Sequence, residues 1–230
     1  MTDIKKSDII RPPIFIHHGV KAFFTTNSLN CNLNSISKLL NIQKNKIYLP
    51  AQKHTDKIHV LESDLKKTVA DAVLTREKGI LIGVKVADCV PVLLYDKQKS
   101  AIGAVHAGWR GTAKQILKNT IKTMRESFNS STGDILIAIG PSIRGCCYKV
   151  GVDVKNAVKA AGTGKFCFKK DGKCFIDLSS ENIEQALSAG ISKHNIWQSE
   201  ECTHCNPEKF HSYRHSKTLV GKQGGFIGLW

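Results

Sequence analysis

Cys89 and His106 are the residues whose types and spacing most clearly indicate chemistry in this chain. They lie at the outer ends of two apolar runs, residues 90–95 and 100–106, which the polar residues 96–99 separate. Two such runs around a short polar turn are typical of a β-hairpin. A turn centred on residues 96–99 places Cys89 directly opposite His106, with their Cβ atoms roughly 5 Å apart. We therefore predict that both side chains can reach one metal ion.

A thiolate and an imidazole are suitable ligands for zinc, but a catalytic zinc usually takes three protein ligands and keeps a fourth position open. His54 is the best third ligand upstream, because the nearby His59 falls in a predicted strand over residues 57–61. An open zinc ion lowers the pKa of bound water to about 7. The predicted metal ligands are therefore His54, Cys89 and His106.

Charged residues near this trio are candidates for catalysis and substrate binding. Asp88 could orient a ligand or act as an acid–base group, or it could be a simple cap or salt-bridge partner. Arg110, Arg144 and Arg214 are candidates for an anion site, since the planar guanidinium suits phosphate. Arg110 is favoured because it lies four residues past His106.

The elements that must position these residues are a mixture of strands and helices. Strands are predicted within residues 15–25 and over 80–86, 90–95 and 135–139, and helices over 35–40, 112–128, 152–161 and 179–189. Ser35 and Ser179 are the predicted N-caps of the first and last of these helices. Hairpins next to long helices favour an α+β fold over a parallel βαβ fold.

The eight cysteines suggest thiols or metal ligands rather than a disulfide framework, since we expect a cytoplasmic protein. Cys202, Cys205 and His211 could hold a second, structural metal, although only one CxxC pair is present. Cys167 and Cys174 flank a predicted hairpin turn and could face each other.

Bulk properties indicate one domain over residues 1–230, with no linker, no repeat and no apolar run long enough to span a membrane. The first residues lack the apolar core of a signal peptide. The net charge is +15, which would also suit a non-catalytic nucleic-acid binder. However, the lysines are spread along the chain and aromatic residues make up only 7% of it, which favours a solvated surface.

Several motifs resemble the laccase-domain family, also called the purine nucleoside phosphorylase or polyphenol oxidase family. The matching segments are QKH (52–54), DAVLT (71–75), ADCVP (87–91), VHAGWRGT (105–112), IGPSI (139–143), CCY (146–148), CT (202–203) and SYR (212–214). The resemblance implies a four-layer α/β/β/α sandwich with mixed, largely antiparallel sheets. It also implies a zinc ion on His54, Cys89 and His106, and we predict Gln52, Arg144 and Arg214 as substrate contacts.

The resemblance implies phosphorolysis of adenosine, inosine and methylthioadenosine, with some adenosine deamination. An older family label is a copper-dependent polyphenol oxidase. The chain has none of the His-x-His segments from which multicopper oxidases build their cluster, although copper can bind such ligands more tightly than zinc. A third alternative is a metal-independent hydrolase with Cys89 as nucleophile and His106 as its base.

The chain departs from the family pattern at three places that bear on substrate preference. An arginine that usually follows the first Phe-Thr motif is missing beside Asn27, Lys149 replaces an acidic residue, and Lys222 replaces an arginine. We expect these changes to touch anion or ribose contacts. The oligomeric state is left open by the sequence.

Overall fold

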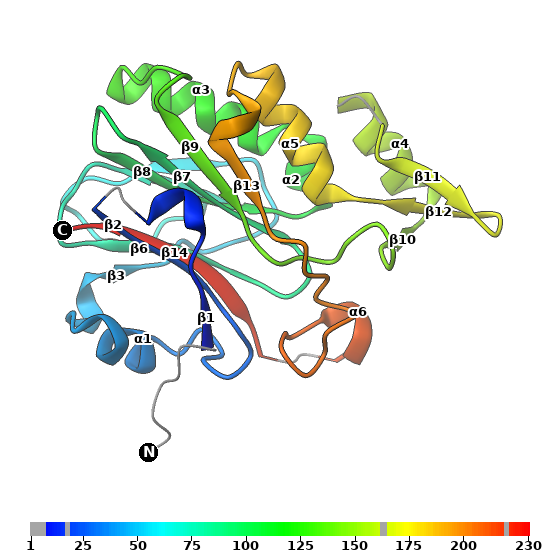
Figure 1. The fold of residues 1–230 in the computed structure, drawn as a ribbon, viewed down its shortest axis with the longest axis horizontal. Coiled ribbons are helices and arrows are strands. Elements are labelled where there is room, and N and C mark those ends of the chain that lie inside the picture. The colour runs from blue at the N-terminus through cyan, green and yellow to red at the C-terminus, as the bar shows by residue number, and fades with distance from the viewer. Residues whose placement is uncertain (1–7, 17–18, 162–164, 219–220) are drawn as a thin grey trace.

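Two mixed β-sheets and the helices packed on them position the predicted site (Figure 1). The computed structural model describes residues 8–16, 19–161, 165–218 and 221–230. The helices are α1 (Leu33–Leu40), α2 (Trp109–Ala113), α3 (Ile116–Phe128), α4 (Val152–Ala161), α5 (Leu178–Ser188) and α6 (Tyr213–Ser216). The strands are β1 (Ile9–Ile10), β2 (Val20–Thr25), β3 (Ile47–Tyr48), β4 (Ile58–Val60), β5 (Ala72–Thr75), β6 (Leu81–Val86), β7 (Val90–Asp96), β8 (Ala101–Ala107), β9 (Ile135–Ile139), β10 (Lys149–Val150), β11 (Cys167–Lys170), β12 (Lys173–Ile176), β13 (Ile196–Gln198) and β14 (Gln223–Leu229).

Both large sheets are mainly antiparallel, as predicted. One sheet has the strand order β13-β9-β7-β8-β5-β4, and only its two edge pairs, β13 with β9 and β4 with β5, are parallel. The other has the order β1-β2-β14-β6-β3, in which only β3 pairs in parallel. A small antiparallel sheet, β10-β12-β11, lies beside α4. The predicted α+β class is confirmed.

Alternating side chains of the central strands enter different hydrophobic clusters. On β7, Val92 and Leu94 pack in a cluster with α3 and α5, whereas Leu93 packs between the two sheets. A third cluster joins the outer face of the other sheet to α1, where Ile36 is fully buried. Because side chains alternate across a strand, each sheet contributes to two clusters. The three clusters therefore separate four layers, with helices outside and the two sheets inside (Figure 1).

The β7–β8 hairpin forms, but its register differs from the predicted one. Pro91, rather than Cys89, lies directly opposite His106, and Cys89 comes just before β7. The shift is two residues. Since the side-chain period of a strand is two, this shift keeps Cys89 on the same side of the sheet as His106.

The turn of this hairpin explains the shift. Asp96 stays in β7, and its carboxylate accepts hydrogen bonds from the backbone N–H groups of Gln98 and Lys99, at 2.8 and 2.9 Å. Ser100, predicted to begin the second strand, instead takes a left-handed conformation with φ of 49°. The turn therefore occupies residues 97–100 and not 96–99.

Most predicted helices and strands are confirmed, with changes at their ends. The strand at 135–139 and the helix at 152–161 match β9 and α4. The helix predicted over 112–128 is two helices, α2 and α3, because Gln115 has φ of 57° and interrupts it. Asn32 caps α1 and Asp177 caps α5, so the predicted caps Ser35 and Ser179 are wrong.

Cys167 and Cys174 do not face each other. Asp171 and Gly172 form a two-residue turn with positive φ at both positions, which places Lys169 opposite Cys174. Among the described residues, no helix has the length and apolar character needed to cross a membrane.

Candidate active site

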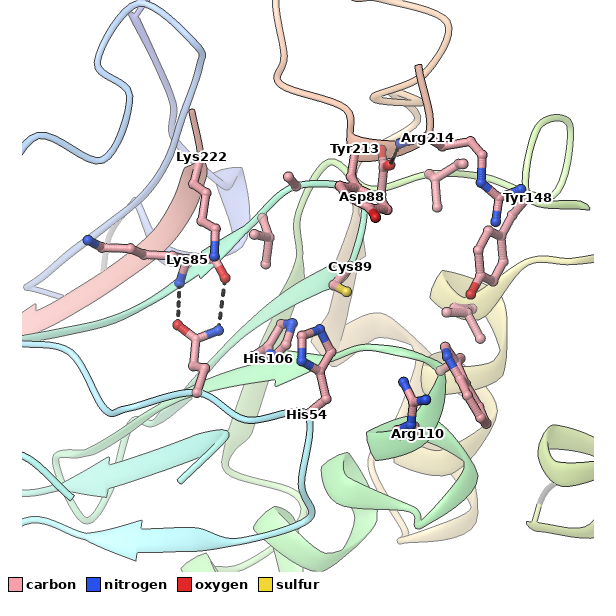
Figure 2. A pocket seen from close by; sticks show the side chains of 16 residues that line it. His54, Lys85, Asp88, Cys89, His106, Arg110, Tyr148, Tyr213, Arg214 and Lys222 are labelled. Carbon is pink, nitrogen blue, oxygen red and sulfur yellow. Dashed lines mark hydrogen bonds between the residues drawn. The ribbon is translucent and has the colours of Figure 1, made fainter. Parts of the chain in front are cut away.

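The structure brings His54, Cys89 and His106 together from three separate segments. His54 lies in the loop between β3 and β4, Cys89 in the turn between β6 and β7, and His106 in β8. Their sulfur and ring nitrogen atoms all lie within 4.8 Å of one another. The two imidazoles meet edge to face, with ring centroids 4.8 Å apart. The predicted trio is thus a compact cluster of metal-type donors (Figure 2).

Asp71 holds two members of this trio in place. It is fully buried just before β5, and its carboxylate accepts a 2.7 Å hydrogen bond from Nδ1 of His106. It also accepts hydrogen bonds from the backbone N–H groups of Lys53, His54 and Thr55 and from the Thr55 hydroxyl. A proton on Nδ1 leaves the Nε2 lone pair of His106 free for a metal. Sequence reasoning assigned no role to Asp71, and its place in the 71–75 motif was the only signal.

The trio and Asp71 form a strongly coupled set of charges. Burial disfavours ionisation of Asp71, but the hydrogen bonds from His106 and Thr55 outweigh it and lower its pKa well below the usual range. Burial likewise opposes the thiolate of Cys89, yet the neighbouring His106 and His54 lower its pKa to about 6. Burial alone would lower the pKa of His106, but the Cys89 charge and the Asp71 bond raise it to about 9. The site favours a thiolate beside positive charge.

Gly108 leaves the space that a metal ion would need. A Cβ atom at this position would lie 3.1 Å from the Cys89 sulfur and 3.2 Å from Cδ2 of His54. One sulfur and two imidazole nitrogens, with a fourth side open to a pocket, are the donor set of a catalytic zinc site. The same donors also suit copper. The residues present therefore fit a single catalytic ion.

The trio lies at the edge of a cavity of about 480 Å³, a volume typical of small-molecule sites. Its cationic lining residues are Lys85, Arg110, Arg214 and Lys222, and its aromatic ones are Trp109, Tyr148 and Tyr213. Among the described residues that line it, Asp88 is the one carboxylate. Figure 2 shows the labelled side chains arranged around the cavity. The excess of cations makes it suited to an anionic ligand.

Asp88 lines the pocket, but both of its carboxylate oxygens already have partners. Oδ1 accepts from the hydroxyl of Thr203 and Oδ2 from the backbone N–H of Arg214, each at 2.7 Å. Asp88 also has φ of 83°. Asp71, and not the predicted Asp88, makes the hydrogen bond that orients a histidine. Asp88 fastens the C-terminal segment to the turn that carries Cys89.

The three predicted arginines have different positions. Arg110 is exposed at the start of α2, stacks over Trp109 at 4.3 Å and lines the pocket. Arg214 also lines it, while its Nη1 donates to the Lys149 carbonyl at 2.7 Å. Arg144 does not line the pocket, so the structure does not bring it to the predicted substrate site.

Two predicted substrate contacts make hydrogen bonds within the fold instead. The guanidinium of Arg144 donates to the Asp177 carboxylate at 3.0 Å and to the Ser199 carbonyl at 2.8 Å. Gln52 lines the pocket, but its amide makes two 2.8 Å hydrogen bonds to the backbone of Lys85 (Figure 2). Gln52 therefore anchors the loop that carries His54.

Several lining residues were missed by sequence reasoning, namely Lys85, Trp109, Tyr148 and Tyr213. Trp109, Tyr148 and Tyr213 lie within recognised motifs, which was a signal, whereas nothing in the sequence marked Lys85. Lys222, noted only as a departure from the family pattern, also lines the cavity.

The second predicted metal site has a different composition from the one expected. Cys202 and Cys205 cluster with Cys146 and Cys147, and His211 is not part of this group. His211 is held at β14, where its backbone N–H donates to the Gln223 side chain at 2.9 Å.

Comparisons with known proteins show which family this chain belongs to. The family described as multi-copper polyphenol oxidoreductase laccase matches residues 25–230. A purine nucleoside phosphorylase of Aquifex aeolicus (strain VF5) is 40% identical, over 83% of this chain and 89% of that protein. An adenosine deaminase, RL5, from an unknown prokaryotic organism is 32% identical, over 85% of this chain and 79% of that protein. The crystal structure of YlmD from Geobacillus stearothermophilus superposes with a TM-score of 0.90 at 25% identity, covering 99% of this chain and 98% of that one.

Proposed function

The chain belongs to the multi-copper polyphenol oxidoreductase laccase family, and from this premise we propose that it is a zinc-dependent purine nucleoside phosphorylase. Its substrates are adenosine, inosine and methylthioadenosine, and its products are the free base and ribose 1-phosphate or methylthioribose 1-phosphate. One observation carries the proposal: a three-ligand metal trio opens onto a pocket with four cationic side chains. Relatives named purine nucleoside phosphorylase support it.

Phosphate binds through the pocket's cations. In the described part of the chain, no carboxylate forms a salt bridge with Arg110, Arg214 or Lys222. Arginine binds phosphate through paired N–H groups, and such charge-assisted bonds are roughly twice as strong as neutral ones. Arg110 is the principal phosphate ligand because its side chain is exposed and lines the same pocket as the trio (Figure 2).

The reaction joins a phosphate oxygen to C1′ of the ribose while the bond from C1′ to the purine nitrogen breaks. The bonding electron pair leaves with the base, which then takes up a proton. A zinc ion on the trio would supply a Lewis acid at this end of the pocket. Tyr148 is suited to hydrogen-bond the departing base, since burial raises its pKa to about 12 and keeps its hydroxyl protonated. Trp109 and Tyr213 supply aromatic surfaces for the purine.

The test is to purify the protein without added metal, quantify bound metal, and incubate adenosine with and without phosphate. We expect about one catalytic zinc ion per chain, and adenine and ribose 1-phosphate in equal amounts, formed only with phosphate. The variants His54→Ala, Cys89→Ala and His106→Ala should lose both this ion and turnover, while the control Cys174→Ser should keep both. Purine release by a variant that lacks the ion would refute the proposal. Formation of inosine without phosphate would instead identify a deaminase.

A second candidate function follows from the arrangement of Asp71, which hydrogen-bonds His106, and of His106, which lies beside the Cys89 thiol. An acid that orients a histidine beside a thiol is also the arrangement of a cysteine hydrolase. This candidate predicts ester hydrolysis that survives metal removal and is abolished by alkylation of Cys89. Loss of that hydrolysis on chelation would exclude it.

Copper-dependent polyphenol oxidation is the activity named in the family description. It predicts oxygen uptake with a phenol by the copper-loaded protein at a rate comparable with its purine turnover. Copper content alone does not decide between polyphenol oxidation and purine phosphorolysis, because copper binds such donors more tightly than zinc.

A further inference from the structure

We propose that Cys146, Cys147, Cys202 and Cys205 form a second, structural zinc site, separate from the catalytic trio. The four sulfur atoms lie within 4.8 Å of one another. The Cys205 sulfur is 3.3 Å from that of Cys147 and 3.8 Å from that of Cys146. Four sulfurs at the Zn–S distance of about 2.3 Å form a tetrahedron with edges of about 3.8 Å. The observed distances, 3.3 and 3.8 Å for these two pairs and at most 4.8 Å among all four sulfurs, are close to those of four ligands around a single ion.

The four cysteines come from two segments that the fold already holds side by side. Cys146 and Cys147 lie in the turn after β9, and the CxxC pair lies in the loop after β13. Ser142 and Cys202 form a parallel β-bridge, and the Thr203 N–H donates to the Ser142 carbonyl at 3.1 Å. The site is thus built on an ordered backbone rather than on a chance contact of loose ends.

Backbone hydrogen bonds prepare the Cys202 sulfur for a cation. The sulfur of Cys202 accepts the N–H of Arg144 at 3.4 Å and also the N–H of Cys205. N–H donors aimed at sulfur favour its thiolate form, which is the form that binds metals. Arg144 is itself fixed by its ion pair with Asp177.

The ligand chemistry favours zinc over the alternatives. A tetrahedral set of four thiolates is typical of zinc or of an iron–sulfur centre. A cluster of several irons would hold its cysteines farther apart than a single ion does. A disulfide would use two of the sulfurs and would not explain why all four converge.

The site fastens one wall of the substrate pocket. Tyr148, which lines the pocket, directly follows Cys147. Thr203, inside the CxxC pair, donates to Asp88 at 2.7 Å. Loss of the ion should therefore loosen Tyr148 and weaken the Thr203–Asp88 hydrogen bond, and should lower kcat while the trio retains its own ion.

The test counts metal ions in variants of the full-length chain. The wild-type protein, reduced and reconstituted with zinc, should bind two ions per chain. Cys205→Ser and Cys146→Ser change exposed residues, so they should fold, and each should bind one ion. Cys89→Ala should also bind one, the double variant Cys89→Ala/Cys205→Ser none, and the matched control Cys174→Ser two.

Cobalt replacement identifies which site each variant has lost. The intense thiolate-to-cobalt absorption of a four-sulfur site should persist in Cys89→Ala and disappear in Cys205→Ser, whose melting temperature should also fall. One zinc ion in the wild type, a second ion retained by Cys205→Ser, iron in place of zinc, or a disulfide among these cysteines in the reconstituted protein would overturn the proposal. Failure of Cys89→Ala to abolish purine release would refute only the proposed function.

Discussion

Replacing Asp71 with asparagine should weaken metal binding at the trio and destabilise the fold. The two carboxylate oxygens of Asp71 accept five hydrogen bonds, whereas the side chain of asparagine has only one accepting oxygen. In either orientation the new amide opposes two N–H donors. If it faces Nδ1 of His106, that ring is stabilised in the tautomer with its proton on Nε2, which cannot bind a metal.

The magnitude follows from burial and charge. Removing one partner of a buried, charge-assisted pair costs about 3–5 kcal/mol. For a chain of this size, that corresponds to a fall in Tm of about 6–20 °C. Loss of a residue that orients a metal-bound histidine typically lowers metal affinity by about 10–100-fold. We expect both effects in Asp71→Asn, since Asp71 also holds the backbone of His54.

The assay is zinc affinity by competition with a chelator, together with Tm in metal-free buffer. Asp96→Asn is the matched control, because Asp96 is equally buried but caps the hairpin turn away from the trio. It should leave zinc affinity unchanged. The pKa of Asp71 is lowered in the fold, so its contribution is present above its unfolded pKa of about 3.9 and is lost as the pH falls. The Tm difference between wild type and Asp71→Asn should therefore shrink below about pH 4. Zinc affinity of Asp71→Asn within twofold of wild type would refute this reasoning.

Three other substitutions test separate parts of the site. Gly108→Ala should lower zinc affinity at least about tenfold, because the new Cβ atom would lie close to the Cys89 sulfur and the His54 ring. The metal-free Tm should change little, since a φ of −74° suits any residue. Unchanged zinc content would contradict this prediction. Arg110→Ala should raise KM for phosphate about 10–100-fold with Tm unchanged, since losing one charged hydrogen bond costs about 1.5–3 kcal/mol. Arg110→Lys should be intermediate, and an equal effect on the KM for nucleoside would assign Arg110 to a different role. Asp88→Asn should keep kcat within about tenfold of wild type. The asparagine amide can still accept a hydrogen bond from the Arg214 N–H and make another with the Thr203 hydroxyl. A fall in kcat beyond about 100-fold would instead identify Asp88 as an acid–base group.

The β7–β8 hairpin and the approach of Cys89 to His106 could be predicted from the sequence because they depend on local patterns. Apolar runs around a polar turn predicted β7 and β8, and a cysteine and histidine at their ends predicted shared ligands. The register could not be predicted, since it depends on the side-chain bonds of Asp96 and the left-handed backbone of Ser100. The trio survived this error only because the shift was an even number of residues.

Contacts between distant segments could not be predicted. Arg144 was a reasonable phosphate ligand by type, but Asp177, which caps α5, binds its guanidinium. Only Cys202 and Cys205 of the four-cysteine cluster were predicted as ligands. The other pair, Cys146 and Cys147, is adjacent in sequence rather than a CxxC motif, and the two segments meet through a β-bridge. In each case the partner is chosen by tertiary packing, which residue type and spacing do not encode.

Two of the ten described non-glycine residues with positive φ lie at this site. His54 and Asp88 have φ of 56° and 83°, a region that residues other than glycine rarely occupy. Such conformations cost about 1–3 kcal/mol each and persist only where surrounding contacts hold them. Here the holding contacts are known: Asp71 accepts the His54 N–H, and Thr203 and Arg214 bind the Asp88 carboxylate. The polar groups that stabilise the strained backbone are thus the ones that aim His54 and Cys89 at a common point. It follows that stability and metal affinity at the trio should fall together when these contacts are removed. Changing Arg110 should lower neither, and changing the four-cysteine cluster should lower Tm while the trio keeps its ion.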